Sequence, residues 1–314
     1  MISYPMRALT TGVLVLAISA PVEAASAAAP TGGGHALHSQ TLADLDTSMS
    51  GEAFAYTLYS LFADQADEQG LSAVKDLFQR TAKVELGEHF TEEAALSGLV
   101  GSDAANLQSA IKGEDYESRD MYPTFAKQAR QDGDIAAAEL FDEIAGDEAA
   151  HHAAFVKALE AIRTGKGSIP APPSVKPVSV SAGTPKVRAA RTRANLDTAL
   201  HGEALAHVKY AQYAQAAAAR GNQALARLFA GTAEVERREH FAGEAQLAGT
   251  VRTTRENLSK AITGEKYESQ TMYPGFAQQA RAAGDSGPAE LFDEIARDEA
   301  GHARAFQAAR DKLH

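Results

Sequence analysis

The chain repeats itself at an interval of 151 residues. The segment LDTSMSGEA at 45–53 returns as LDTALHGEA at 196–204, and AELFDEIAGDEAAH at 138–151 returns as AELFDEIARDEAGH at 289–302. The register holds between these segments without an insertion or a deletion. A duplication of this quality predicts two structural units built to the same plan. It argues against one large fold without internal symmetry.

Each copy has the sequence pattern of four helices. In the first copy, apolar residues recur every three or four positions over residues 42–69, 72–97, 103–131 and 135–161, and the first three segments end at glycines. Strand patterns are absent from the sequence. Prolines fall within these helices at Pro123 and Pro274, where we expect local kinks. The sequence therefore predicts an all-α protein with two antiparallel four-helix bundles in tandem.

The regions outside the repeats have a different character. Residues 1–25 combine a cationic start, an apolar stretch and small residues, which is the pattern of a signal peptide; an uncleaved anchor is the alternative. Residues 163–193 contain five prolines among Ser, Gly and Lys, which predicts an extended linker. We therefore expect an exported protein, periplasmic or secreted, with bundles at 40–162 and 194–314.

Composition limits the chemistry that the chain can perform. It contains no cysteine, so disulfides, thiol catalysis, iron–sulfur clusters and cysteine-based zinc sites are excluded, and any metal must bind His, Asp or Glu. The formal net charge is −11, although the linker is basic. An acidic body repels nucleic acid and attracts cations. We expect no nucleic-acid partner.

Acidic residues and histidines recur on all four helices of each copy. Within each helix they lie three or four positions apart, which places them on one face. Apolar neighbours such as Val84, Phe90 and Ile144 predict that these acids point inward, where several carboxylates are stable only around a cation. For one such group alone, a solvated face is the better interpretation, but recurrence on four helices favours a metal pair. Oxygen-rich ligation favours iron or manganese over zinc. The candidates are Glu52, Glu85, Glu88, His89, Glu114, Glu117, Glu148 and His151, and their counterparts Glu203, Glu236, Glu239, His240, Glu265, Glu268, Glu299 and His302.

The motifs around these residues resemble the ferritin-like di-iron domain of rubrerythrin. They are Gly-Glu in helix one, Thr-Ala-x-x-Glu in helix two, Gly-Glu-x-Tyr-Glu-x-x-x-Met-Tyr-Pro in helix three and Asp-Glu-x-x-His in helix four, and both copies carry them. The resemblance implies two ferritin-like antiparallel four-helix bundles in tandem, each with two iron ions or with manganese. It implies reduction of hydrogen peroxide, or oxidation of ferrous iron by O2 or peroxide. Non-catalytic binding of iron or manganese is a third interpretation.

The resemblance also assigns roles to individual residues. It implies that Glu52, Glu85, Glu114, Glu117, Glu148 and His151 are ligands, with Glu85 and Glu148 bridging the metals. Tyr59 and Tyr122, with their counterparts Tyr210 and Tyr273, match tyrosines that line the family's site; core packing is the alternative.

Two departures from the family pattern affect the chemistry. The family has histidine three residues after the helix-two glutamate, where this chain has Glu88 and Glu239, and His89 and His240 follow one residue later. The sequence leaves open which residue of each pair reaches the metal. The rubredoxin module that feeds electrons to such centres is missing, so we expect an external electron donor.

The exact register and the long linker bear on how the copies are arranged. They predict that the two bundles pack against each other as an intrachain pseudo-dimer. If the bundles pack independently, each metal site is complete within one copy. If the copies exchange helix pairs, each site is built from both.

Overall fold

The chain is almost entirely helical over its described part. The computed structural model describes residues 36–313; residues 1–35, which include the expected signal peptide, and residue 314 lie outside that part. The first repeat contains α1 (Ser39–Glu68), α2 (Ser72–Val84), η1 (Glu85–Phe90), α3 (Thr91–Ser97), α4 (Asp103–Tyr116), η2 (Glu117–Met121), α5 (Tyr122–Asp132) and α6 (Ile135–Thr164). The second contains α7 (Ala190–Ala219), α8 (Gln223–Val235), η3 (Glu236–Phe241), α9 (Ala242–Ala248), α10 (Thr254–Tyr267), η4 (Glu268–Met272), α11 (Tyr273–Ala283) and α12 (Ser286–Asp311).

The four predicted helices are present in each repeat, but two of them are interrupted by π-helical turns. The η1 and η3 turns interrupt helix two of each repeat, and η2 and η4 interrupt helix three. In helix three the π turn lies immediately before the segment containing Pro123 or Pro274. Proline has no N–H to donate to the preceding turn, so a change of helical hydrogen bonding is expected there. The irregularity foreseen at these prolines therefore takes the form of a π turn.

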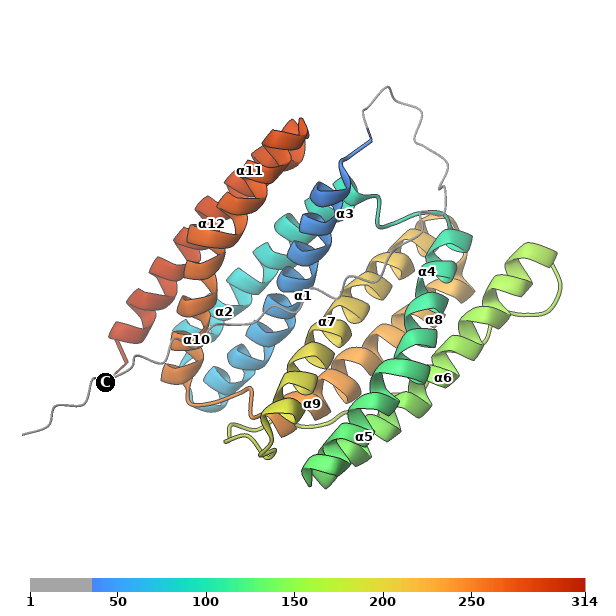
Figure 1. Ribbon diagram of the computed structural model, residues 1–314, viewed down its shortest axis with the longest axis horizontal. Coiled ribbons are helices and arrows are strands. Elements are labelled where there is room, and N and C mark those ends of the chain that lie inside the picture. Colours follow the sequence, from blue (N-terminus) through green and yellow to red (C-terminus); the bar gives the residue numbers. More distant parts are fainter. Residues whose placement is uncertain (1–35, 314) are drawn as a thin grey trace, which may run out of the picture. The chain divides into compact units, whose positions relative to one another are not determined.

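Each four-helix bundle takes two helices from each repeat (Figure 1). Helices α1 and α2–η1–α3 pack against α10–η4–α11 and α12, and this set is called bundle A. Helices α7 and α8–η3–α9 pack against α4–η2–α5 and α6, and this set is called bundle B. The bundles contact each other mainly through α1 and α7. The boundaries 40–162 and 194–314 therefore mark the sequence repeats and not the bundles, because the turn from α3 to α4 leads from one bundle into the other.

Polar contacts at the helix starts also cross between the repeats. The Oδ2 atom of Asp285, just before α12, accepts hydrogen bonds from the His38 backbone N–H at 2.9 Å and the Thr41 hydroxyl at 2.6 Å. The Asp134 carboxylate, just before α6, accepts hydrogen bonds from the backbone N–H groups of Arg188 and Ala189 at 2.8 and 3.0 Å. These two residues lead into α7. Each repeat thus caps the first helix of the other.

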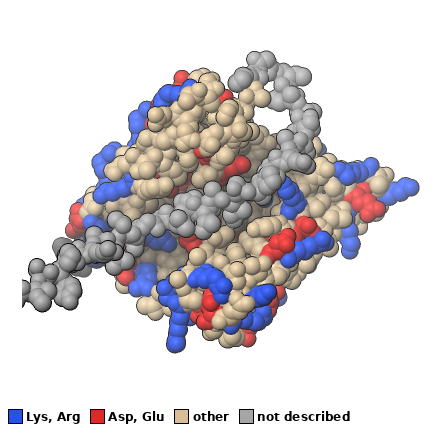
Figure 2. All heavy atoms as spheres, in the orientation of Figure 1, with Lys and Arg blue, Asp and Glu red and all other residues tan. Residues whose placement is uncertain are grey.

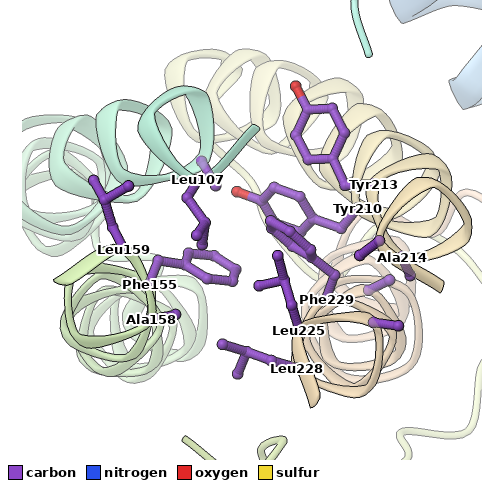
Figure 3. Packing of buried hydrophobic residues seen from close by; sticks show 14 of the residues in the cluster. Leu107, Phe155, Ala158, Leu159, Tyr210, Tyr213, Ala214, Leu225, Leu228 and Phe229 are labelled. Atoms are coloured by element: carbon purple, nitrogen blue, oxygen red, sulfur yellow. The ribbon is translucent and has the colours of Figure 1, made fainter. Parts of the chain in front are cut away.

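The aromatic core of each bundle is shared between the repeats in the same way. In bundle B, Phe155 of α6 packs against Tyr210 of α7 and Phe229 of α8, with ring centroids 5.4 and 5.2 Å apart, while Leu107 of α4 completes the cluster (Figure 3). In bundle A, Phe306 holds the equivalent place between the rings of helices one and two. Burying one such side chain stabilises a fold by about 1.5–3 kcal/mol. Separating the repeats would expose all of these rings.

The segment between Thr164 and Ala190 is extended and follows bundle B. The backbone N–H of Val178 donates to the backbone carbonyl of Arg238 at 2.8 Å, and that of Lys186 donates to the backbone carbonyl of Leu247 at 2.8 Å. A Cβ on Gly249 would stand 2.4 Å from the backbone nitrogen of Pro185, so only glycine lets the linker approach so closely. The linker is therefore part of the wall of bundle B.

No helix in residues 36–313 is long and apolar enough to cross a membrane. On the face seen in Figure 2, acidic and basic side chains are interspersed over the described residues.

Candidate metal centres

Each bundle holds two adjacent groups of buried carboxylates and histidines. In bundle A, one group is Glu52, Glu85, His89 and Glu299, and the other is Glu85, Glu265, Glu299 and His302. In bundle B, the groups are Glu148, Glu203, Glu236 and His240, and Glu114, Glu148, His151 and Glu236. Within each group the potential ligand atoms lie within 4.8 Å of one another. Two glutamates in each bundle belong to both groups.

The shared glutamates lie between the two groups and offer one oxygen to each. In bundle B, Glu148 Oε1 lies 3.1 Å from His240 Nδ1, and Glu148 Oε2 lies 3.0 Å from His151 Nδ1. Glu236 mirrors it, with Oε2 2.8 Å from His240 and Oε1 3.3 Å from His151. This is the arrangement of carboxylates that bridge two metal ions. The pairs are Glu148 with Glu236 and Glu85 with Glu299, so the expected pairing of Glu85 with Glu148 is corrected by the helix exchange.

The π turns determine which residue of helix two faces the centre. His89 Nδ1 lies 3.0 Å from Glu85 and 3.2 Å from Glu299, whereas Glu88 is exposed. A π turn holds more residues than an α turn, so it moves Glu88 further from the direction of Glu85 but keeps His89 near it. Glu239 is likewise turned outward and accepts the backbone N–H of Lys176 in the linker. Glu88 and Glu239, expected among the ligands, thus lie outside the clusters, and His89 and His240 occupy them.

An aspartate lies behind each of these two histidines. Asp298 Oδ2 is 3.6 Å from His89 Nε2, and Asp147 Oδ2 is 3.5 Å from His240 Nε2. A carboxylate on the outer nitrogen fixes the ring orientation and leaves Nδ1 to face the centre. The signal for this role is present in the sequence, because each aspartate directly precedes a bridging glutamate in the Asp-Glu-x-x-His motif. The aspartate and its histidine come from different repeats.

All four expected tyrosines donate hydrogen bonds to non-bridging glutamates. The Tyr59 hydroxyl donates to Glu265 and that of Tyr210 to Glu114, both at 2.5 Å. Tyr273 donates to Glu52, and Tyr122 donates to Glu203. Burial raises the pKa of each phenol well above its usual value, and the neighbouring carboxylates raise it further, so the hydroxyls stay protonated. Each bond joins residues of different repeats.

Glu117 and Glu268 lie beside the clusters rather than within them. The Glu117 carboxylate rests against two glycines: its Oε2 and Oε1 are each 3.7 Å from where a Cβ would stand on Gly113 and on Gly202. Glu268 lies in the same way against the equivalent glycines of bundle A, at 3.9 and 4.0 Å. Burial raises the pKa of both carboxyls, and the neighbouring glutamates add to the shift. These residues are placed to join the ligand set with a small movement, because no side chain stands on either glycine.

A further buried acid in each bundle was not foreseen from the sequence. Glu93 and Glu244 have no solvent exposure, and burial raises the pKa of each well above its usual value. Glu244 Oε1 accepts from Tyr122 at 3.0 Å. Glu93 Oε1 accepts from Ser48, which lies 2.8 Å from the Tyr273 hydroxyl. The sequence did contain a signal for them, because Glu93 and Glu244 lie 151 residues apart and so occupy equivalent positions in the two repeats. A glutamate that is present on the apolar face of a helix in both repeats is a candidate for burial inside the bundle.

The clusters have the properties of cation sites. Buried oxygens of Glu85 and Glu236, and the Nδ1 atoms of His89 and His240 that face the centre, have no hydrogen-bond partner. Burial raises the pKa of Glu52 to about 7 and those of Glu203 and Glu265 to about 8. Among residues 36–313, the cluster carboxylates form ion pairs only with histidines. Unpartnered buried donors around shared carboxylates fit divalent cations.

Comparisons with known proteins identify the family of the chain. The sequence profile named Rubrerythrin matches residues 83–160 and 194–310. The chain is 33% identical over 140 residues to a rubrerythrin of Porphyromonas gingivalis, covering 40% of this chain and 70% of that protein. It is 32% identical over 141 residues to a rubrerythrin of Nitratidesulfovibrio vulgaris, covering 41% and 73%. A nigerythrin of the same organism is 33% identical over 135 residues, covering 39% and 67%. No solved structure matches significantly. The profile covers more than half of the sequence, so the chain belongs to the rubrerythrin family.

Proposed function

We propose that this protein reduces hydrogen peroxide to water at two di-iron centres, one in each bundle, in defence against oxidative stress. The observation that carries the proposal is the pair of bridging glutamates in each bundle, each of which offers one oxygen to both ligand groups. Bound iron ions would supply the two electrons that cleavage of the peroxide O–O bond requires. Manganese is the other metal that the oxygen-rich ligand set suits.

The protein residues divide into a fixed and an adjustable part. Tyr59, Tyr122, Tyr210 and Tyr273 hold the four non-bridging glutamates by hydrogen bonds. Buried oxygens of the bridging glutamates make no such bonds. The bridging carboxylates are therefore free to change how they bind when the charge of the centre changes, while the tyrosines keep the ends of the centre in place. Burial excludes bulk water from both parts.

Peroxide reduction consumes two protons and two electrons for each pair of water molecules formed. The 314 residues contain no cysteine, so the cysteine-bound iron of a rubredoxin cannot lie among them. We infer that an external donor, a protein or a small molecule, reduces the centres after each turnover.

We also propose that the chain is exported and that the two bundles act as an intrachain pseudo-dimer. The first 25 residues support export through their signal-like pattern. The stacking of Tyr56 on His207, with ring centroids 6.1 Å apart, supports the pseudo-dimer. These two residues occupy equivalent positions in the repeats, and equivalent residues meet only near a two-fold axis.

The test is rapid mixing of the ferrous protein with peroxide or with O2. We expect peroxide to oxidise the iron much faster than O2 does, with one peroxide consumed per bundle. The matched control is the double variant Glu85→Gln, Glu299→Gln, which removes the bridging pair of bundle A. It should halve the amplitude of the absorbance change and leave the rate of the remaining phase unchanged.

The other outcomes identify the alternatives. Faster oxidation by O2, with repeated turnover as ferrous iron is added, would replace the proposal with a ferroxidase. Binding of iron without a spectral change on adding either oxidant would leave a non-catalytic iron- or manganese-binding protein.

A further inference from the structure

The two centres have the same ligands, but a lysine lies beside only one of them. Lys209 Nζ is 3.9 Å from the position that a Cβ on Gly113 would take, and Glu117 Oε2 is 3.7 Å from the same point. The ammonium group and this carboxylate therefore border the same glycine in bundle B. The lysine also lies over the ring of Tyr210, with Nζ 5.1 Å from the ring centroid. Tyr210 in turn donates to the cluster residue Glu114.

The equivalent place in bundle A carries no charge. The residue 151 positions before Lys209 is Leu58, which is buried in the aromatic core with Tyr59 and Phe62. A Cβ on Gly264, the counterpart of Gly113, would have Glu268 Oε2 as its neighbour at 3.9 Å, and no cation of residues 36–313 would lie within 4 Å of it. Glu268 thus faces its centre without a competing cation of this kind.

The geometry points to two centres of unequal affinity. We propose that Lys209 makes the centre of bundle B the weaker site for divalent cations, so that metal fills bundle A first. This inference rests on the proposed function. Two effects act in the same direction: the ammonium group repels a nearby divalent cation, and it attracts the Glu117 carboxylate that would otherwise be available to the metal. The same repulsion favours the less positive, reduced state of the bundle B metals.

The test separates the two centres in the full chain and measures binding of Mn²⁺, which does not require turnover. Glu148→Gln with Glu236→Gln leaves only the bundle A centre, and Glu85→Gln with Glu299→Gln leaves only that of bundle B. By calorimetry, we expect the bundle A centre to bind Mn²⁺ about tenfold more tightly, as one nearby charge at an intermediate dielectric would produce. Lys209→Leu, which installs the bundle A residue, should remove the difference. Lys209→Arg should retain it because it keeps the charge.

The control variant is Lys157→Leu, which removes the same charge from an exposed position on α6 of bundle B. It should leave the Mn²⁺ affinity of both centres unchanged. In the otherwise unmodified chain, the Mn²⁺ isotherm should show two classes of site, and Lys209→Leu should merge them into one. This second measurement needs no variant at a ligand.

Equal affinities of the two isolated centres would overturn this inference and leave the proposed peroxide reduction standing. An unchanged difference in Lys209→Leu, or the same change in Lys157→Leu, would also overturn it. If neither the isolated centres nor the unmodified chain bound Mn²⁺ or Fe²⁺, both the inference and the proposed function would be overturned.

Discussion

Bundles A and B contain the same six clustered side chains but surround them differently. In bundle A, Ser48 lies between Glu93 and Tyr273, whereas bundle B has Ala199 at that position and Tyr122 reaches Glu244 directly at 3.0 Å. The side chain of His302 is 16% exposed in bundle A, and that of His151 is 5% exposed in bundle B. The linker covers part of bundle B. After duplication, the cluster residues stayed the same while their neighbours diverged.

The exchange of helices means that this comparison is not between the two repeats. Each repeat supplies half of each centre. In the first repeat, a change in helix two therefore affects bundle A, and a change in helix four affects bundle B. Bundle A consists of residues 36–98 and 254–313, and bundle B consists of residues 103–164 and 190–249. These are the two sets of residues that a comparison of the bundles must use.

The largest expected effect distinguishes exchanged from independent bundles. Glu85→Ala and Glu299→Ala lie in different repeats but in one centre, so their combination should lose about two of the four metal ions, as each single variant does. Glu85→Ala with Glu148→Ala should lose all four, because it removes a bridging acid from both centres. Metal analysis of the purified variants measures this. Loss of all four ions from the Glu85, Glu299 pair would contradict the exchange.

A slightly smaller effect concerns oligomeric state. The fragment 40–162 contains α1–α3 of bundle A and α4–α6 of bundle B, and alone it lacks the partners that cover Phe78 and Phe155. We expect it to form a homodimer by the same exchange, since two copies can complete two bundles. Light scattering after size exclusion gives the mass. A stable monomer with two bound metals would show that the exchange is not required.

The pH dependence of metal-induced stability should be smaller but measurable. The folded-state pKa values of Glu52, Glu203 and Glu265, at about 7 to 8, lie above the usual carboxyl value, so their contribution to apoprotein stability is present at acid pH and lost as pH rises from about 4.5 to 8. Metal replaces the lost protons as the compensating positive charge. The increase in melting temperature on adding Mn²⁺ should therefore be larger at pH 8 than at pH 6. An equal increase at both values would contradict these shifts.

The smallest expected effect comes from making bundle A resemble bundle B at one position. Ser48→Ala removes the hydroxyl between Glu93 and Tyr273, which should cost about 1 kcal/mol of unfolding free energy. It should leave the metal content unchanged, because Ala199 occupies this place in bundle B. Chemical denaturation and metal analysis check the two parts. Loss of metal from the variant would mean that Ser48 helps to hold the centre.

Much of the fold could be predicted from the sequence because helix periodicity and glycine stops are local signals. The helices of 72–97 and 135–161 are present within a few residues of their expected ends. The π turns were not predictable from the sequence, and α-helical spacing places Glu88 and His89 on either side of the direction of Glu85. The choice between them stayed open until the structure placed His89 in the cluster and Glu88 at the surface. The choice of partner helices was also undetermined, because nearly identical repeats offer nearly identical packing surfaces. Only the structure shows that Glu85 faces Glu299.

The helix exchange fixes the order in which the chain can complete its two halves during synthesis. Bundle B needs nothing beyond α9, so its parts are all available once residue 248 has emerged. Bundle A joins α1 to α12, and its first helices must wait for almost the last residue of the chain. Contacts so distant in sequence form slowly, and apolar surface left uncovered in the meantime is prone to aggregation. The early helices α1–α3 are thus the segment of a newly made chain most dependent on temporary protection.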